Sequence, residues 1–218
     1  MIGMDSLPYH SCSELRNETL ETPPLPQQPS GTTSELFIRI KRTIAGQTYL
    51  PESVCALLTF WVFSTFFQET HTFLPCLVIT GPAHEGTVVL RALNTVCYAP
   101  KLLAGLNSAI IKDIGGHYGP TLLIFDPNLD KRTAAFLDCF TNRGFIMSVE
   151  RSYRSFFSSK AIYAGDAPPM KSMPQQSIHI NATVASNAAP QHASQLSREY
   201  TDGLRKQLQQ YSERNRSS

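Results

Sequence analysis

Two uninterrupted apolar runs constrain the fold of this 218-residue chain more than any other feature. The first run, Cys76–Thr80, leads directly into Gly81, and the second, residues 121–125, leads directly into Asp126. A strand is apolar on both faces when helices cover both faces of its sheet, which is the usual arrangement of parallel sheets. The two runs therefore predict buried strands of a mostly parallel sheet.

Segments with helical spacing alternate with these and other short apolar runs. Apolar residues recur every three or four positions in five segments: residues 36–44, 54–66, 88–96, 108–114 and 129–142. Further strand candidates are residues 145–149, 161–164 and 177–181. Alternation of the two periods predicts an α/β domain with helices on both faces of its sheet.

The composition divides the chain into three parts. Residues 1–33 are rich in proline and polar residues, which predicts a disordered leader. Residues 34–183 hold the α/β domain. Residues 184–218 comprise a polar linker and a C-terminal amphipathic helix, whose apolar stripe is Leu196, Tyr200, Leu204, Leu208 and Tyr211.

Cysteine usage favours a reducing cytoplasm. The five cysteines are scattered and have no CxxC spacing, so they indicate neither a disulfide framework nor a zinc site. The formal net charge of +2 is too small to point to an acidic partner by itself. No signal peptide is evident at the start. The apolar segment 54–67 is shorter than the roughly 20 residues that a membrane span requires, so it predicts a buried helix and no membrane association.

The segment after the first apolar run has the glycine spacing of a phosphate-binding P-loop, G-x-x-x-x-G-K-[ST]. In that pattern the backbone N–H groups would converge on a phosphate at the start of a helix. Thr87 stands where the lysine belongs, and Val88 stands where the magnesium-binding hydroxyl belongs. An ordinary tight strand-to-helix turn is the alternative. The candidate nucleotide-binding residues are Gly81, Pro82, Ala83, His84, Glu85, Gly86, Thr87 and Val88.

Asp126 follows the second apolar run, where an acidic residue of the magnesium shell would lie. It is the candidate metal residue, and the alternative is that it caps the next helix. Pro127 stands where ATPases of this kind carry a water-activating glutamate. One preorganised group contributes about 10²–10³ in rate, so loss of several groups predicts no useful turnover.

Together these segments resemble the helicase-like P-loop ATPases associated with primases of phage and mobile elements, over residues 36–182. The resemblance is carried by Trp61, by Pro75 before the first run, by the 81–88 segment and by the 120–127 segment, PTLLIFDP. It implies a P-loop NTPase-like sheet, with ATP and Mg²⁺ as possible cofactors. Gln175 and Gln176 stand near the place where the family tends to carry an arginine, which is a further departure.

Three functions follow from these observations. The first is a pseudo-ATPase, an interaction module related to replication or mobile-element helicases; the second is an ATPase with relocated catalytic groups. The third is single-stranded nucleic-acid binding by Arg143, Arg151 and Arg154, which lie among aromatic residues that bases could stack on. A solvated surface is the alternative for these arginines. The sequence leaves the oligomeric state and the choice between a protein and a nucleic-acid partner open.

Overall fold

The computed structural model describes residues 32–107, 110, 119–149, 152–166, 174–183 and 198–216. The leader predicted at residues 1–33 lies outside this part of the chain, except for Thr32 and Thr33 at the start of the first helix. The linker 184–197 and most of the helix predicted at 108–114 lie outside it as well.

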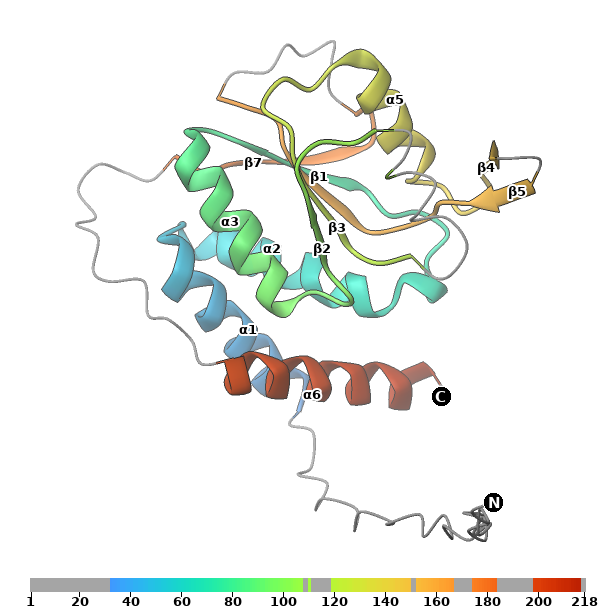
Figure 1. Cartoon of the computed structure of the whole chain (residues 1–218). Coiled ribbons are helices and arrows are strands. Elements are labelled where there is room, and N and C mark those ends of the chain that lie inside the picture. The colour runs from blue at the N-terminus through green and yellow to red at the C-terminus, as the bar shows by residue number, and fades with distance from the viewer. Residues whose placement is uncertain are drawn as a thin grey trace, which may run out of the picture.

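The described helices and strands alternate through most of the chain (Figure 1). The helices are α1 (Thr33–Thr48), α2 (Glu52–Phe66), the 3₁₀ turn η1 (Gln68–Thr70), α3 (Ala83–Val96), α5 (Lys131–Cys139) and α6 (Arg198–Arg216). The strands are β1 (Cys76–Thr80), β2 (Lys101–Leu103), β3 (Leu122–Phe125), β4 (Ile146–Val149), β5 (Ser152–Ser155), β6 (Lys160–Tyr163) and β7 (Ser177–Asn181).

Five strands form one parallel sheet in the order β2-β3-β6-β1-β7. Strand β6 lies between β1 and β3. One strand therefore separates β1, which leads into Gly81, from β3, which leads into Asp126. The parallel α/β sheet predicted from the apolar runs is confirmed. Since all five strands point the same way, the loops after β1, β3, β6 and β7 meet at one edge, where α/β proteins usually bind ligands.

Helices cover both faces of the sheet. Leu77 and Ile79 of β1 belong to a buried cluster with α1, α2, α3 and α6, whereas Cys76 and Val78 belong to a second cluster with α5. This division follows from the two-residue repeat of a strand, which sends alternate side chains to opposite faces. Both faces of β1 are therefore core, as its uninterrupted apolar run requires.

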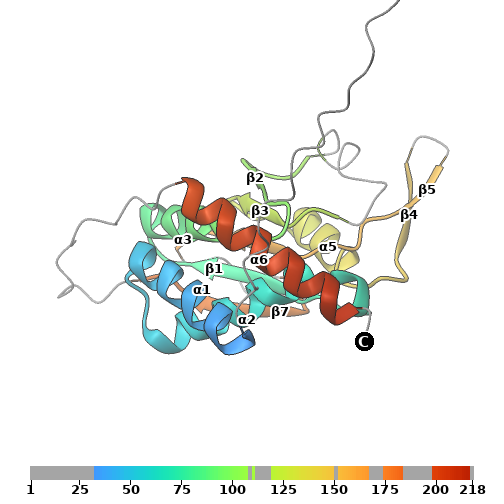
Figure 2. The ribbon, with the colours of Figure 1, turned by 90° about the horizontal axis from the view of Figure 1, so that it is seen from below.

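Helix α6 packs on the domain and crosses the layer formed by α1, α2 and α3 (Figure 2). Leu204 and Leu208 of its apolar stripe are fully buried. Arg205 donates to the carbonyl oxygen of Asn94 near the end of α3, and Arg216 donates to that of Phe66 at the end of α2, at 2.6 Å. Carbonyls at helix C-termini lack partners within their own helix, so α6 supplies donors to two helix ends.

The structure differs from the sequence predictions in three places. Residues 146–149 form a strand, but it pairs with β5 in a separate antiparallel hairpin that projects from the main sheet (Figure 1). The short strands β2 and β5 were not predicted. Helix α3 begins at Ala83, five residues before its predicted start at residue 88. Residues 83–87, which were expected to form a loop, are therefore helical.

The apolar segment 54–67 forms most of α2, which packs in the core as predicted. In the part of the chain that is described, no helix combines the length and the apolar character needed to cross a membrane.

A buried lysine lies at the amino edge of the sheet. Lys160 begins β6 and is completely buried, and its Nζ donates to the carbonyl oxygens of Leu74 at 3.0 Å and Ser158 at 3.3 Å. Burial lowers the pKa of Lys160 to about 8, against the weaker opposite effects of Cys76 and Asp138. Burial also raises the pKa of Cys76 to about 12.

Stability should therefore depend on pH through Lys160. From pH 8 to pH 9 the unfolded chain keeps this proton while the folded chain loses it, so Lys160 should add about 1 kcal/mol to the unfolding free energy. The raised pKa values of the buried thiols, Cys76 and Cys97 above all, oppose this contribution, because unfolded thiols already ionise in this pH range. In urea unfolding, the change from pH 8 to pH 9 should therefore be more positive in the wild type than in Lys160→Met by about 1 kcal/mol. An equal change in both proteins would contradict the assignment to Lys160.

Candidate functional site

The candidate site lies at the carboxyl edge of the sheet, where the end of β6 holds the two flanking loops. The N–H of Gly81 donates to the carbonyl oxygen of Gly165 at 3.2 Å, and the N–H of Asp126 donates to that of Tyr163 at 3.0 Å. The glycine after the first apolar run and the aspartate after the second are thus attached to the same intervening segment.

The segment Gly81–Val88 does not form the expected loop. Helix α3 begins at Ala83, and the N–H of Gly86 donates to the carbonyl oxygen of Pro82 at 3.0 Å, as in any α-helix. Thr87 Oγ1 donates to the carbonyl oxygen of Ala83 at 2.8 Å, one turn back in the same helix. Helical hydrogen bonding takes up the backbone N–H groups from Gly86 onward, so only those of the first turn of α3 are left to face a phosphate. Nucleotide binding by this segment stays a prediction.

Tyr163 fills the space beside the first turns of α3. Its ring stacks on Phe125 with centroids 5.0 Å apart, and its hydroxyl donates to the carbonyl oxygen of Gly81 at 2.8 Å. A Cβ atom at position 86 would overlap ring atoms of Tyr163, so the ring lies directly against the backbone of Gly86. Burial raises the pKa of the Tyr163 hydroxyl, with a further contribution from Asp166. Gly86 is thus explained by close packing without any ligand.

Gly81 is required by its backbone angle and by its neighbours. Its φ is +123°, which side-chain-bearing residues rarely adopt, and a Cβ there would lie 3.1 Å from the N atom of Thr183 and 3.2 Å from Asn181 Oδ1. The tight strand-to-helix turn, the alternative in the sequence analysis, matches this geometry. Both glycines of the motif therefore have structural roles.

Asp126 accepts a hydrogen bond from the N–H of Asn128 at 3.3 Å, which closes a local turn. The N-cap of α5 is instead Asp130, whose carboxylate accepts from the N–H of Thr133 at 2.7 Å. The backbone donor at Thr133 lowers the pKa of Asp130. The alternative that Asp126 caps the following helix is thus wrong.

The described residues include no group of three His, Cys, Asp or Glu side chains that could hold a metal ion. A magnesium role for Asp126 is therefore supported only by its place after β3.

His84 and Glu85 lie in the first turn of α3 rather than at the tip of a loop. The His84 side chain is 80% exposed, and its Nε2 lies 3.8 Å from Glu85 Oε1. An acidic side chain in the first turn stabilises the positive end of the helix dipole. Glu85 is therefore accounted for by the start of the helix.

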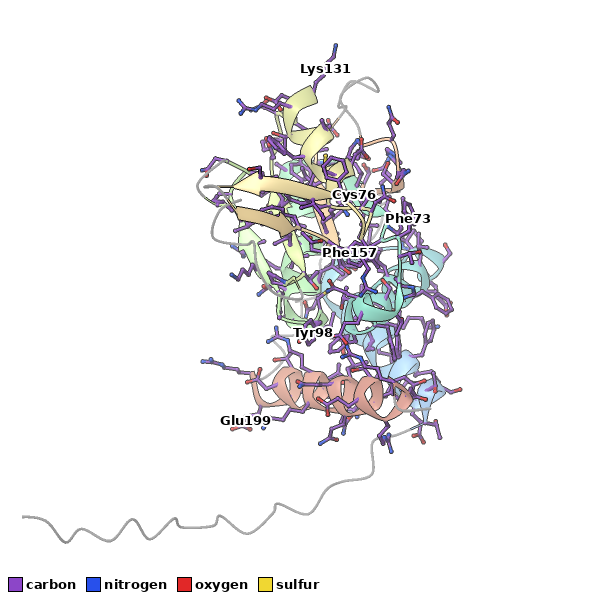
Figure 3. The ribbon with its side chains drawn as sticks, turned by 90° about the vertical axis from the view of Figure 1, so that its right-hand side faces the viewer. Phe73, Cys76, Tyr98, Lys131, Phe157 and Glu199 are labelled. Atoms are coloured by element: carbon purple, nitrogen blue, oxygen red, sulfur yellow. The ribbon has the colours of Figure 1, made fainter. Side chains whose placement is uncertain are left out.

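Two of the three arginines of the nucleic-acid hypothesis, Arg143 and Arg154, lie just before β4 and in β5. Arg143 is exposed, and its guanidinium lies over the Phe157 ring at 5.5 Å from the centroid. Figure 3 shows Phe157 on the same side of the molecule as Phe73. Arg151 lies outside the described residues, and of Arg154 only the backbone, in β5, is described. Only Arg143 is thus placed beside an aromatic ring.

Sequence reasoning missed the residue that organises this edge. Tyr163 is the last residue of the β6 apolar run, and its identity gives no signal that it reaches Gly81 and Gly86. The signals that were available lay in α3 itself: Pro82 directly precedes the helix, and Glu85 is in its first turn.

Gly86→Ala should destabilise the protein by about 1–3 kcal/mol, because the added methyl group must displace the Tyr163 ring. Gly203→Ala in α6 is the matched control: a Cβ there meets nothing within 4 Å, so the better helix propensity of alanine should stabilise by about 0.5–1 kcal/mol. Denaturant unfolding measures both. In a Tyr163→Leu background the Gly86→Ala penalty should shrink. Equal effects of the two alanine substitutions in the wild-type background would contradict the contact.

Comparison with known proteins adds no assignment to this geometry. No protein-family model matches the chain, and no curated protein matches it.

Proposed function

We propose that the chain is a catalytically inactive, P-loop-type ATPase domain that serves as an interaction module. One observation carries this proposal: α3 starts at Ala83, and Tyr163 occupies the space beside its first turns. The parallel sheet, with Gly81 after one strand and Asp126 after another, supports descent from a nucleotide-binding arrangement. The side chains and the loop that such chemistry needs are replaced by packing.

The geometry argues against phosphoryl chemistry at three positions. Thr87 is hydrogen-bonded within α3, Val88 is 37% exposed on the helix surface, and Pro127 offers no general base. Catalysis of phosphoryl transfer depends on positioned charge around the phosphate. None of these three side chains supplies a positive charge or a general base, and the Thr87 hydroxyl is engaged with its own helix.

An exposed apolar surface on α1 and α2 supports the interaction role. Phe60 of α2 is 64% exposed, and its ring lies 4.7 Å from that of Phe37 in α1. Leu57, one turn earlier in α2, is also exposed. Apolar side chains that gather at a surface are typical of protein contacts. A protein partner of the module would bury this surface.

The purified chain should neither bind nor hydrolyse Mg²⁺–ATP. A ligand present at 100 times its Kd would stabilise the fold by about 2.7 kcal/mol, so thermal unfolding with and without ATP is a sensitive test alongside calorimetric titration. We expect no change in Tm and no saturable heat. Saturable binding with hydrolysis that Asp126→Asn abolishes would favour the alternative of an ATPase with relocated catalytic groups.

Restoring the two missing side chains tests whether ATP binding is absent because of those side chains or because of the helical backbone. In the double variant Thr87→Lys, Val88→Ser, the lysine would project from the second turn of α3 instead of the base of a loop. We therefore expect the double variant to remain unable to bind ATP. Gain of ATP binding by this variant would show that the loop conformation is still accessible.

Single-stranded nucleic-acid binding is a second candidate, favoured by the Arg143–Phe157 contact and by Phe145, which is exposed two residues after Arg143 in the chain. Bases stacked on aromatic side chains contribute roughly 1–3 kcal/mol each, so Arg143→Ala should weaken oligo(dT) binding at least threefold in fluorescence anisotropy. Arg132→Ala is the control, because Arg132 makes a similar contact with Phe136 on α5. Binding that is insensitive to salt, or equally affected by both substitutions, would count against this function.

A further inference from the structure

A pocket lies where α6 passes the ends of α2 and α3, away from the carboxyl edge of the sheet. Its volume is about 300 Å³, at the lower end of the range for small-molecule sites. It is lined by Phe66, Cys97, Tyr98, Ala99, Pro100, Arg205 and Gln209. Figure 3 shows Tyr98 between the body of the domain and α6. Nothing in the proposed function uses this pocket.

Arg205 gives the pocket a fixed positive charge with spare hydrogen-bonding capacity. One of its Nη atoms donates to the Asn94 carbonyl oxygen at the end of α3, the other makes an ion pair with Asp202 Oδ1 at 3.8 Å, and its Nε is buried without a hydrogen-bond partner among the described residues. A guanidinium has five N–H donors. The hydrogen bond to Asn94 uses one of these donors and holds the guanidinium in place, while other N–H donors remain for a ligand.

Apolar and aromatic groups form the opposite wall. The Phe66 and Tyr98 rings meet edge to face with centroids 5.6 Å apart, and Pro100 follows them along the wall. The backbone between Tyr98 and Pro100 is strained. Ala99 has a φ of +37°, and it precedes a proline, which disfavours helical backbone angles in the residue before it. Strained backbone of this kind is concentrated at ligand-binding and switch sites.

We propose that this pocket binds a small carboxylate with a planar aromatic body. The carboxylate would accept two parallel hydrogen bonds from the guanidinium of Arg205, the geometry in which arginine binds carboxylates best. The aromatic body would lie against Tyr98 and Pro100, and the buried Phe66 ring would hold Tyr98 in place through their edge-to-face contact. Gln209, one turn after Arg205 in α6, would lie at the rim because its side chain is exposed.

Benzoate is the probe, titrated into the full chain and followed by backbone amide chemical shifts. We expect saturable shifts confined to Phe66, residues 97–99 and residues 205–209, and at least tenfold weaker binding of the neutral isostere benzamide. Titration to about 10 mM nearly saturates a site with a Kd of about 1 mM. Shifts that do not saturate by then, that map elsewhere, or that are equal for benzamide would overturn the proposal.

Two variants and one control test the residues. Arg205→Gln should weaken benzoate binding at least tenfold, and Gln209→Trp should do the same by filling the rim while it leaves Arg205 bonded to Asn94. Arg216→Gln is the control, because Arg216 also donates to a helix end from α6 but does not line the pocket. Wild-type affinity in Gln209→Trp, or an equal loss in Arg216→Gln, would overturn the proposal. The second result would show that the pocket depends only on the docking of α6.

Discussion

The contact between Tyr163 and the backbone of α3 determines the conformation of the whole carboxyl edge. The Tyr163 ring lies against Gly86, and its hydroxyl bonds the carbonyl oxygen of Gly81. In a phosphate-binding loop the bound anion gathers the backbone donors, and the loop needs room for it. Here a side chain from the neighbouring strand fills the room, and the backbone donors from Gly86 onward are satisfied inside the helix. From Gly86 onward this segment therefore needs no ligand to satisfy its backbone.

The sequence predicted the sheet well, because the signal for a doubly covered strand is local. Each residue of Cys76–Ile79 is fully buried, as an apolar run between two helical layers must be. The same reasoning could not find β2, whose three residues lie at the edge of the sheet, where Lys101 and Leu102 are exposed. It also could not foresee that Lys160 is buried, because its partner Leu74 lies far away along the chain. Local periodicity indicates which strands are buried on both faces. It does not indicate which distant backbone carbonyl accepts a hydrogen bond from a buried lysine.

The candidate site was harder to predict, since glycine spacing has two physical meanings. Because glycine has no side chain, its backbone can be approached closely by an ion, or a large side chain can pack directly against it. At position 86 the second meaning applies, and the deciding residue, Tyr163, is brought there only by the pairing of β6 between β1 and β3. The contact that explains the glycine therefore depends on the strand order, which the residues around the glycine do not encode.

The changes in side chains and in backbone at this edge are physically coupled. A loop that had only lost its lysine would keep its curved backbone and would still offer N–H donors to an anion. Once α3 extends back to Ala83, position 87 lies in its second turn, and the Thr87 hydroxyl bonds a carbonyl of its own helix. A lysine there would gain nothing from a phosphate, and a hydroxyl at position 88 would sit on an exposed helix face. The side chains of Thr87 and Val88 and the helical conformation of their backbone thus account for each other, and the proposal of an inactive domain rests on both together.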